Sequence, residues 1–156
     1  MMDEKTMREL FFAYWEELAG YAGEEFILSE AIEDYLDRLT EENIRWHPIR
    51  ANGKQVGFFR IGWGNACHPD ADWFIADMYV RPDYRRQGLA TKAMGDYISK
   101  HTGRKYCLFI IDGNKGARAF WDKFFTQQGF MPMYLADVGA GDETCTQYGW
   151  QKIYRE

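Results

Sequence analysis

The chain has 156 residues, of which 46% are hydrophobic, and this length and composition are typical of one globular domain. Its formal net charge of -5 argues against a surface that binds nucleic-acid phosphates, because such binding depends on clustered Lys and Arg. The sequence has neither the apolar core of a signal peptide nor an apolar run of about 18 residues. We therefore expect a cytoplasmic protein with no nucleic-acid partner and no membrane partner.

The cysteines do not form a recognisable framework. Cys67, Cys107 and Cys145 are odd in number, widely spaced and without a Cys-x-x-Cys pair. This pattern predicts neither structural disulfides nor a metal site, and it fits a reducing compartment.

The N-terminal half predicts two helices and then a hairpin. Apolar residues at helical spacing predict a helix over 4–19 that Gly20 ends, and Ser29 is predicted to cap a second helix. Asn52-Gly53 lies between two strand-like segments and therefore predicts a tight hairpin turn. The strands predicted in this half are 44–50, 55–61 and 73–80, with a loop over 64–70.

The C-terminal half alternates helices and strands. Pro82 ends the strand before it, since proline cannot donate to a strand ladder, and Gly129 signals the end of a helix. The predicted helices are 88–100 and 115–127, and the predicted strands are 106–111, 131–137 and 147–154. The whole order predicts a single mixed α/β domain over 1–156, with one sheet covered by helices.

The segment between the strand at 73–80 and the following helix has the features of an anion site. Gly88 lacks a Cβ, so a phosphate could approach the backbone, and the N–H groups at the helix start favour an anion. Arg85 and Arg86 add positive charge. The segment is neither a P-loop nor a dinucleotide fingerprint, and the alternative is a solvated turn with two surface arginines.

Two blocks of residues resemble one known family. Tyr79-Val80-x-Pro82 followed by Arg85-x-x-Gly88-x-Ala90 resembles motif A of the GNAT superfamily of N-acetyltransferases. Asn114-x-x-Ala117-x-x-Phe120-Trp121, followed by Gly129-Phe130, is similar to motif B of the same family. The matched residues cover about 77–130. The usual first strand of the family is not evident, because a helical pattern begins almost at the N-terminus.

The resemblance implies a GNAT-like fold, with a mixed, mostly antiparallel sheet and helices on both faces. It also implies acetyl-CoA as cosubstrate, with no metal. The pyrophosphate would rest on backbone amides from Arg86 to Ala90, and the pantetheine arm would pair with the main chain of the preceding strand. The residues expected to bind acetyl-CoA are Met78, Tyr79, Val80, Arg85, Arg86, Gln87, Gly88, Leu89, Ala90, Thr91, Asn114, Ala117, Phe120 and Trp121.

The resemblance further implies direct attack of an amine on the thioester, assisted by a backbone N–H near Val80. We expect Asp77 to be the base, and the alternative is a structural carboxylate; Asp72, Asp112 and water are other candidates. Trp121 stands where the family usually has a tyrosine acid, and indole has no titratable proton in the useful range. Tyr134 is a substitute acid, or the thiolate leaves without one.

The acceptor is expected to be a primary amine of a small molecule. Aromatic and acidic residues from elements that border the acceptor cleft in this family could hold an ammonium, or could be ordinary core and surface residues. They are Tyr14, Trp15, Trp46, Trp63, Trp73, Glu24 and Glu25. The alternatives are a protein N-acetyltransferase, a catalytically silent CoA-binding or sensor module, and a nucleotide-binding protein. A homodimer is expected from the family.

Overall fold

The computed structural model describes residues 3–22, 44–63, 71–101, 105–133 and 145–152. The helices in these ranges are α1 (Glu4–Ala22), the short 3-10 helix η2 (Pro82–Tyr84), α3 (Leu89–Lys100) and α4 (Lys115–Gln127). The strands are β1 (Ile44–Ala51), β2 (Lys54–Trp63), β3 (Trp73–Val80), β4 (Lys105–Ile111), β5 (Phe130–Met133) and β6 (Cys145–Lys152). The predicted helix capped by Ser29 and the predicted loop over 64–70 lie outside the described residues.

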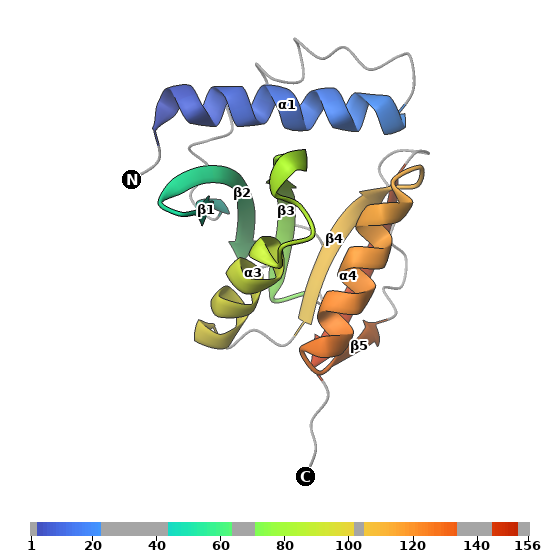
Figure 1. Ribbon diagram of the computed structural model, residues 1–156. Coiled ribbons are helices and arrows are strands. Elements are labelled where there is room, and N and C mark those ends of the chain that lie inside the picture. The colour runs from blue at the N-terminus through green and yellow to red at the C-terminus, as the bar shows by residue number, and fades with distance from the viewer. Residues whose placement is uncertain (1–2, 23–43, 64–70, 102–104, 134–144, 153–156) are drawn as a thin grey trace.

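The six strands form one mixed sheet in the order β1-β2-β3-β4-β6-β5 (Figure 1). Neighbouring strands are antiparallel except for β3 and β4, which are parallel. Parallel neighbours need a crossover connection, and here η2 and α3 supply it. This crossover places the turn before α3 at the carboxyl end of β3.

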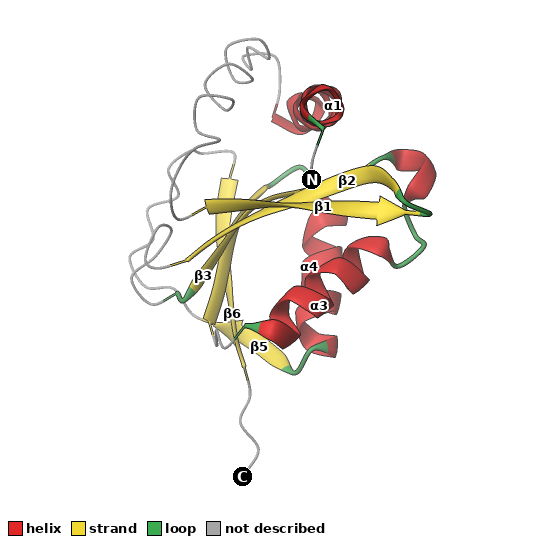
Figure 2. Ribbon diagram, turned by 90° about the vertical axis from the view of Figure 1, so that its left-hand side faces the viewer, coloured by secondary structure: helices red, strands yellow, loops and turns green. Residues whose placement is uncertain are grey.

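Helices cover both faces of the sheet, as predicted (Figure 2). On one face, Leu10 and Phe11 of α1 pack with Phe58 of β2 and Tyr79 of β3. On the other face, α3 and α4 pack on a larger cluster that includes Phe59. Phe58 and Phe59 are adjacent and buried, because successive strand residues point to opposite faces and β2 is covered on both.

The helix α4 is bound to the sheet by an aromatic stripe. Its buried residues are Trp121, Phe124 and Phe125, which stand three and four positions apart and therefore share one face. Phe125 stacks on Trp150 of β6 with ring centroids 4.5 Å apart. Much of the high aromatic content therefore lies in the core beneath β4, β6 and β5.

The predicted boundaries hold closely, with corrections at a few ends. The Asn52-Gly53 turn is confirmed: φ is 51° at Asn52 and 80° at Gly53, the combination that a two-residue hairpin turn of type I′ requires. The prediction that Gly20 ends the first helix is wrong, because α1 continues to Ala22 and a helix tolerates a solvent-exposed glycine. β5 ends at Met133 and β6 at Lys152; residues 134–137 and 153–154 lie outside the described part.

Candidate active site

The sheet opens between its two central strands. The register of β3 and β4 has three pairs, the last being Ile75 with Leu108, although both strands continue beyond them. On the other side of β3 the register shifts where Arg60 pairs with Asp77 and Ile61 with Ile75, which leaves Ala76 as a bulge. A bulge bends and twists a strand. The carboxyl ends of β3 and β4 therefore diverge, as Figure 1 shows.

Alternate residues of β3 direct their backbone groups into this opening. A Cβ added at Gly57 would overlap the Tyr79 carbonyl oxygen, so that carbonyl points toward β2. Successive strand residues direct their N–H and C=O groups to opposite edges. The backbone groups of Met78 and Val80 therefore face β4. Of the three β3 residues expected to pair with the cofactor, these two have the suitable direction.

The turn that follows β3 is built around left-handed backbone. Arg86 has φ of 61° and Gly88 has φ of 76°, and Gly88 is the N-cap residue of α3. No described residue lies within 4 Å of a Cβ placed on Gly88, so this part of the structure leaves the space in front of the helix start open. Within the described residues, no side chain caps this end of α3. The first N–H groups of α3 thus fit an anion such as pyrophosphate.

The Arg85 side chain is directed to α1. Its Nε donates to the Val80 carbonyl at 2.7 Å, and its two terminal nitrogens bind the Glu17 carboxylate at 3.0 and 2.5 Å. Its guanidinium carbon lies 5.4 Å from the centre of the Tyr79 ring. The Arg85 backbone N–H is also engaged, since it donates to the Pro82 carbonyl. Arg85 therefore joins α1 to the end of β3.

Asp77 lies in a buried polar network on the α1 side of the sheet. Its Oδ2 pairs with Arg60 Nε at 2.9 Å and its Oδ1 accepts from the Tyr14 hydroxyl at 2.8 Å. The residue is 6% exposed, and burial raises the pKa of its carboxyl to about 7, although the Tyr14 hydrogen bond favours the charged form. Burial, followed by the neighbouring Asp77 charge, also raises the pKa of Tyr14.

The residues of α4 that were predicted to bind the cofactor make their contacts within the helix. Asn114 is the N-cap, and its Oδ1 accepts from the Ala117 N–H at 3.1 Å. Trp121 is 6% exposed and packs against Phe124 and Phe125, while Phe120 is half-buried. The N-terminus of α4 lies close to α1, because a Cβ added at Gly113 would meet the Tyr21 carbonyl oxygen at 3.1 Å.

The remaining candidates lie next to the ends of β3 and β4 or are not described. Tyr134, Glu24 and Glu25 lie outside the described residues. Asp72 Oδ2 accepts from the Lys105 backbone N–H at 3.0 Å, a contact that links the start of β3 to the start of β4. Asp112 directly follows β4, at the carboxyl end where the sheet opens, and its carboxylate accepts from the Thr146 hydroxyl.

Sequence reasoning missed Glu17 and Arg60. Glu17 stands three residues after Tyr14 and therefore on the same side of α1, the side that meets Asp77 and Arg85. Arg60 is the one cation among the buried residues of β2, and it pairs with the single anion of β3. One Arg and one Asp in two successive apolar strands of the sequence could have indicated a buried ion pair.

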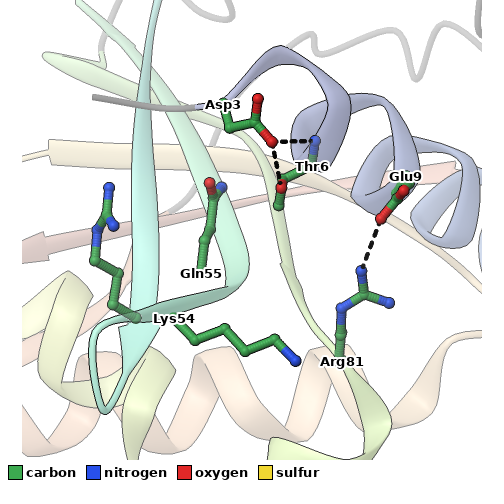
Figure 3. Close-up of a pocket in the computed structure, with 7 residues that line it drawn as sticks. Asp3, Thr6, Glu9, Lys54, Gln55 and Arg81 are labelled. Carbon is green, nitrogen blue, oxygen red and sulfur yellow. Dashed lines mark hydrogen bonds and ion pairs between the residues drawn. The ribbon is translucent and has the colours of Figure 1, made fainter.

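A cavity of about 300 Å³ lies beside this region, between the start of α1 and the β1–β2 hairpin (Figure 3). Its lining residues are Asp3, Thr6, Glu9, Arg50, Lys54, Gln55 and Arg81. None of them is a predicted cofactor residue, and it meets the end of β3 only through Arg81, which lies 3.8 Å from Glu9. We therefore place the candidate site at the opening between β3 and β4.

The chain belongs to the acetyltransferase (GNAT) family, whose model matches residues 5–125. The match includes nearly all of α1 and α4, the opening of the sheet and the Gly88 turn. The predicted family and fold class are thereby confirmed. No curated protein matches the sequence.

Solved structures agree on the fold at low sequence identity. An acetyltransferase from Thermus thermophilus has a TM-score of 0.65 and 19% identity, over 92% of this chain and 86% of that one. PaiA N-acetyltransferase from Thermoplasma acidophilum, in complex with coenzyme A, has a TM-score of 0.61 and 14% identity, over 96% and 92%. Diaminobutyrate acetyltransferase EctA from Paenibacillus lautus, in complex with L-2,4-diaminobutyric acid and coenzyme A, has a TM-score of 0.60 and 14% identity, over 100% and 95%.

Within the described ranges, no helix is both long enough and apolar enough to span a membrane.

Proposed function

We propose that this protein transfers the acetyl group of acetyl-CoA to a primary amine of a small molecule. The observation that carries the proposal is the opening between β3 and β4, which leads to the uncapped start of α3 at Gly88. A backbone edge followed by free helix N–H groups suits a ligand with an amide-containing arm and a pyrophosphate. The structures of PaiA and EctA, which contain coenzyme A, support this choice.

The chain's own groups would hold the cosubstrate in two places. The backbone of Met78 and Val80 would pair with the pantetheine arm, and the N–H groups from Arg86 to Ala90, with the Thr91 hydroxyl, would bind the pyrophosphate. Acetyl-CoA supplies an activated acetyl group as a thioester, which an unprotonated amine attacks directly. A backbone N–H of β3 near Val80 would donate to the thioester oxygen, since fixed dipoles stabilise developing charge.

Asp77 has two assignments within this proposal. As a base it would need to be ionised, so with a pKa of about 7 activity would rise with pH up to neutrality. Its burial and its contacts with Arg60 and Tyr14 support the second assignment, a carboxylate that fixes α1 on the sheet. The pH dependence of kcat/KM in Asp77→Asn separates the two assignments. If Asp77 is the base, the variant loses the rise of kcat/KM with pH. If Asp77 is a structural carboxylate, the variant keeps the pH profile of the wild type. Tyr134 stays the proposed acid.

The acceptor is proposed to be a small amine, and EctA, crystallised with a diamine substrate, supports this choice. A silent CoA-binding module remains the second candidate, because Trp121 has no proton to give to a leaving thiolate and lies in the core. Coenzyme A binding without thiol release from any amine in a broad panel would favour that module. Membership of the family decides against a nucleotide-binding protein.

The deciding experiment is calorimetric and thermal titration with acetyl-CoA, CoA, ATP and NAD in parallel. Ligand that binds the folded chain raises its apparent stability. Gly88→Trp should abolish binding of both CoA species, because the side chain fills the open space before α3. Gly53→Trp is the matched control, since Gly53 also has a positive φ of 80° and open space around it. Failure of the wild type to bind either CoA species would contradict the proposal.

A further inference from the structure

Two phenylalanine rings meet beside the closed end of the opening between β3 and β4. Phe74 of β3 and Phe109 of β4 have ring centroids 6.2 Å apart and ring planes at 83°. They flank the last register pair of the two strands, because Phe74 precedes Ile75 and Phe109 follows Leu108. Phe109 is 41% exposed and Phe74 is half-buried, so the two rings present an apolar surface to solvent.

Both rings lie on the face of the sheet that α1 borders. Ile75 and Leu108 are buried in the cluster under α3 and α4, and successive strand residues point to opposite faces. Phe74 and Phe109 therefore point to the other face, which they share with Asp77 and its contact with α1. Among the described residues, the cluster on which α1 packs includes neither ring. The surface of the two rings thus stays open beside the site.

The direction of the cosubstrate brings its acyl group toward these rings. We assign the pyrophosphate to the Gly88 turn, beyond the carboxyl end of β3, and the pantetheine arm to the backbone of Val80 and Met78. The arm therefore runs from the carboxyl end of β3 toward the closed end at Ile75, with the thioester at its far end. Met78 and Ile75 are separated by about 10 Å along the strand, which is the scale of a small amine.

The closed end of the opening leaves the acceptor one face from which to approach. On the side of α3 and α4 the core fills this end, because Ile75 and Leu108 are 3% and 2% exposed. An amine that attacks the thioester therefore comes from the opposite face. There its body lies against Phe74 and Phe109.

We propose that Phe74 and Phe109 form an aromatic wall for the body of the acceptor, and that the acceptor is a primary amine with an apolar, ring-sized body, such as an arylalkylamine. This inference rests on the proposed function and narrows its substrate class. Covering the exposed Phe109 ring with apolar surface is favourable, and rings at a steep angle suit a third ring. A polyamine or an amino sugar would instead place charged or hydroxyl groups against the wall and would lose their hydration.

The first test compares two amines in the wild type. Thiol release is measured with saturating acetyl-CoA for 2-phenylethylamine and for ethanolamine, which carries a hydroxyl group in place of the ring. We expect kcat/KM to be about tenfold or more higher for 2-phenylethylamine, because the ring is buried on the wall. Spermidine and glucosamine complete the panel. A preference for ethanolamine, spermidine or glucosamine would overturn the proposal.

The second test removes the exposed ring of the wall. Phe109→Ala should lower kcat/KM for 2-phenylethylamine by about tenfold and should leave that for ethanolamine within about twofold. The dissociation constant of acetyl-CoA should also stay within about twofold, because its assigned contacts are backbone groups of other residues. Phe109→Leu keeps an apolar side chain and should retain most of the activity. Phe12→Ala, which removes a 52% exposed ring of α1, should behave as the wild type. Equal losses for both amines in Phe109→Ala would contradict the wall.

A third measurement needs neither acetyl-CoA nor turnover. Wild type and Phe109→Ala are melted in rising 2-phenylethylammonium chloride, with ethanolammonium chloride at equal concentration as the reference. We expect a saturable rise in Tm over the reference for the wild type and none for Phe109→Ala, which far-UV circular dichroism verifies to be folded. No rise in the wild type, or the same rise in both proteins, would refute the wall.

The proposed function and the aromatic wall fail separately. A wild-type protein that neither binds acetyl-CoA nor releases thiol with any amine contradicts the proposed function. The melts with 2-phenylethylammonium still decide whether Phe74 and Phe109 hold an apolar amine.

Discussion

The Tyr14 hydroxyl donates to Asp77 Oδ1 at 2.8 Å, and this bond joins α1 to β3 across 63 positions of sequence. The acceptor carboxylate is also paired with Arg60, so one buried anion links α1, β2 and β3. The Arg85–Glu17 pair makes a second link between α1 and the end of β3. The helix that borders the opening is therefore held by specific polar contacts as well as by its apolar face.

Tyr14→Phe should lower the free energy of unfolding by about 1–3 kcal/mol, because a hydrogen bond to a buried charged group is lost. Urea unfolding at a pH well above the Asp77 pKa of about 7, where the carboxylate is ionised, measures the change. Tyr21→Phe is the control: Tyr21 is also on α1 but is 41% exposed, so a change within about 0.5 kcal/mol is expected. Equal losses in both variants would argue against the Tyr14–Asp77 bond.

Asp77 should make the folded state less stable as pH rises. Its folded pKa of about 7 lies above the ordinary value of 3.8, so the folded chain binds the proton more tightly than the unfolded chain. The free energy of unfolding should therefore fall between about pH 4 and pH 7 and level off above. Asp77→Asn should remove this component of the slope. Urea unfolding of both proteins across that range tests the prediction, and parallel curves would refute it.

Trp121→Ala should cost about 3–5 kcal/mol of stability, because Trp121 is 6% exposed and packs among the aromatic residues of α4. Phe120→Ala is the matched control, since Phe120 is adjacent and only half-buried, and it should cost clearly less. Thermal and urea unfolding measure both. A small loss in Trp121→Ala would place the indole outside the core and return it to the list of cofactor contacts.

Gly57→Ala should destabilise the protein by about 1–3 kcal/mol, because its Cβ would overlap the Tyr79 carbonyl oxygen and would force β2 and β3 apart. Gly20→Ala should instead stabilise the protein by roughly 1 kcal/mol, since Gly20 lies inside α1 with nothing near its Cβ. Circular dichroism melts of the two variants test the opposite signs. The same sign in both would be incompatible with the structure.

Most of the fold could be predicted from local patterns. The Asn52-Gly53 turn, the apolar strand at 73–80 and the helix at 115–127 are encoded by neighbouring residues, and the structure confirms them. The strand order and the opening of the sheet could not be predicted from local patterns. They depend on pairing between distant segments and on a bulge at Ala76, which no local composition marks.

The backbone positions of the site could be predicted from the sequence, but the directions of its side chains could not be predicted as well. Gly88 was identifiable because its lack of a Cβ matters locally, whereas the direction of the Arg85 guanidinium depends on Glu17 of a distant helix. The pairing of Asp77 with Arg60 depends on strand register in the same way. The sequence supported the roles of Asp77 as base and as structural residue without a means to choose between them.

The sheet consists of two antiparallel halves, β1-β2-β3 and β4-β6-β5, and only the three residue pairs between β3 and β4 join them. Beyond Ile75, the register of β3 with β4 ends, so the β3 amides that face the opening are not paired with β4. They should therefore exchange with deuterium faster than the amides of β2. A ligand that pairs with this edge would slow exchange at Met78 and Val80 and leave Tyr79 unchanged. Alternating protection from exchange along these three consecutive residues would thus show that a ligand occupies the opening between β3 and β4, without any assay of turnover.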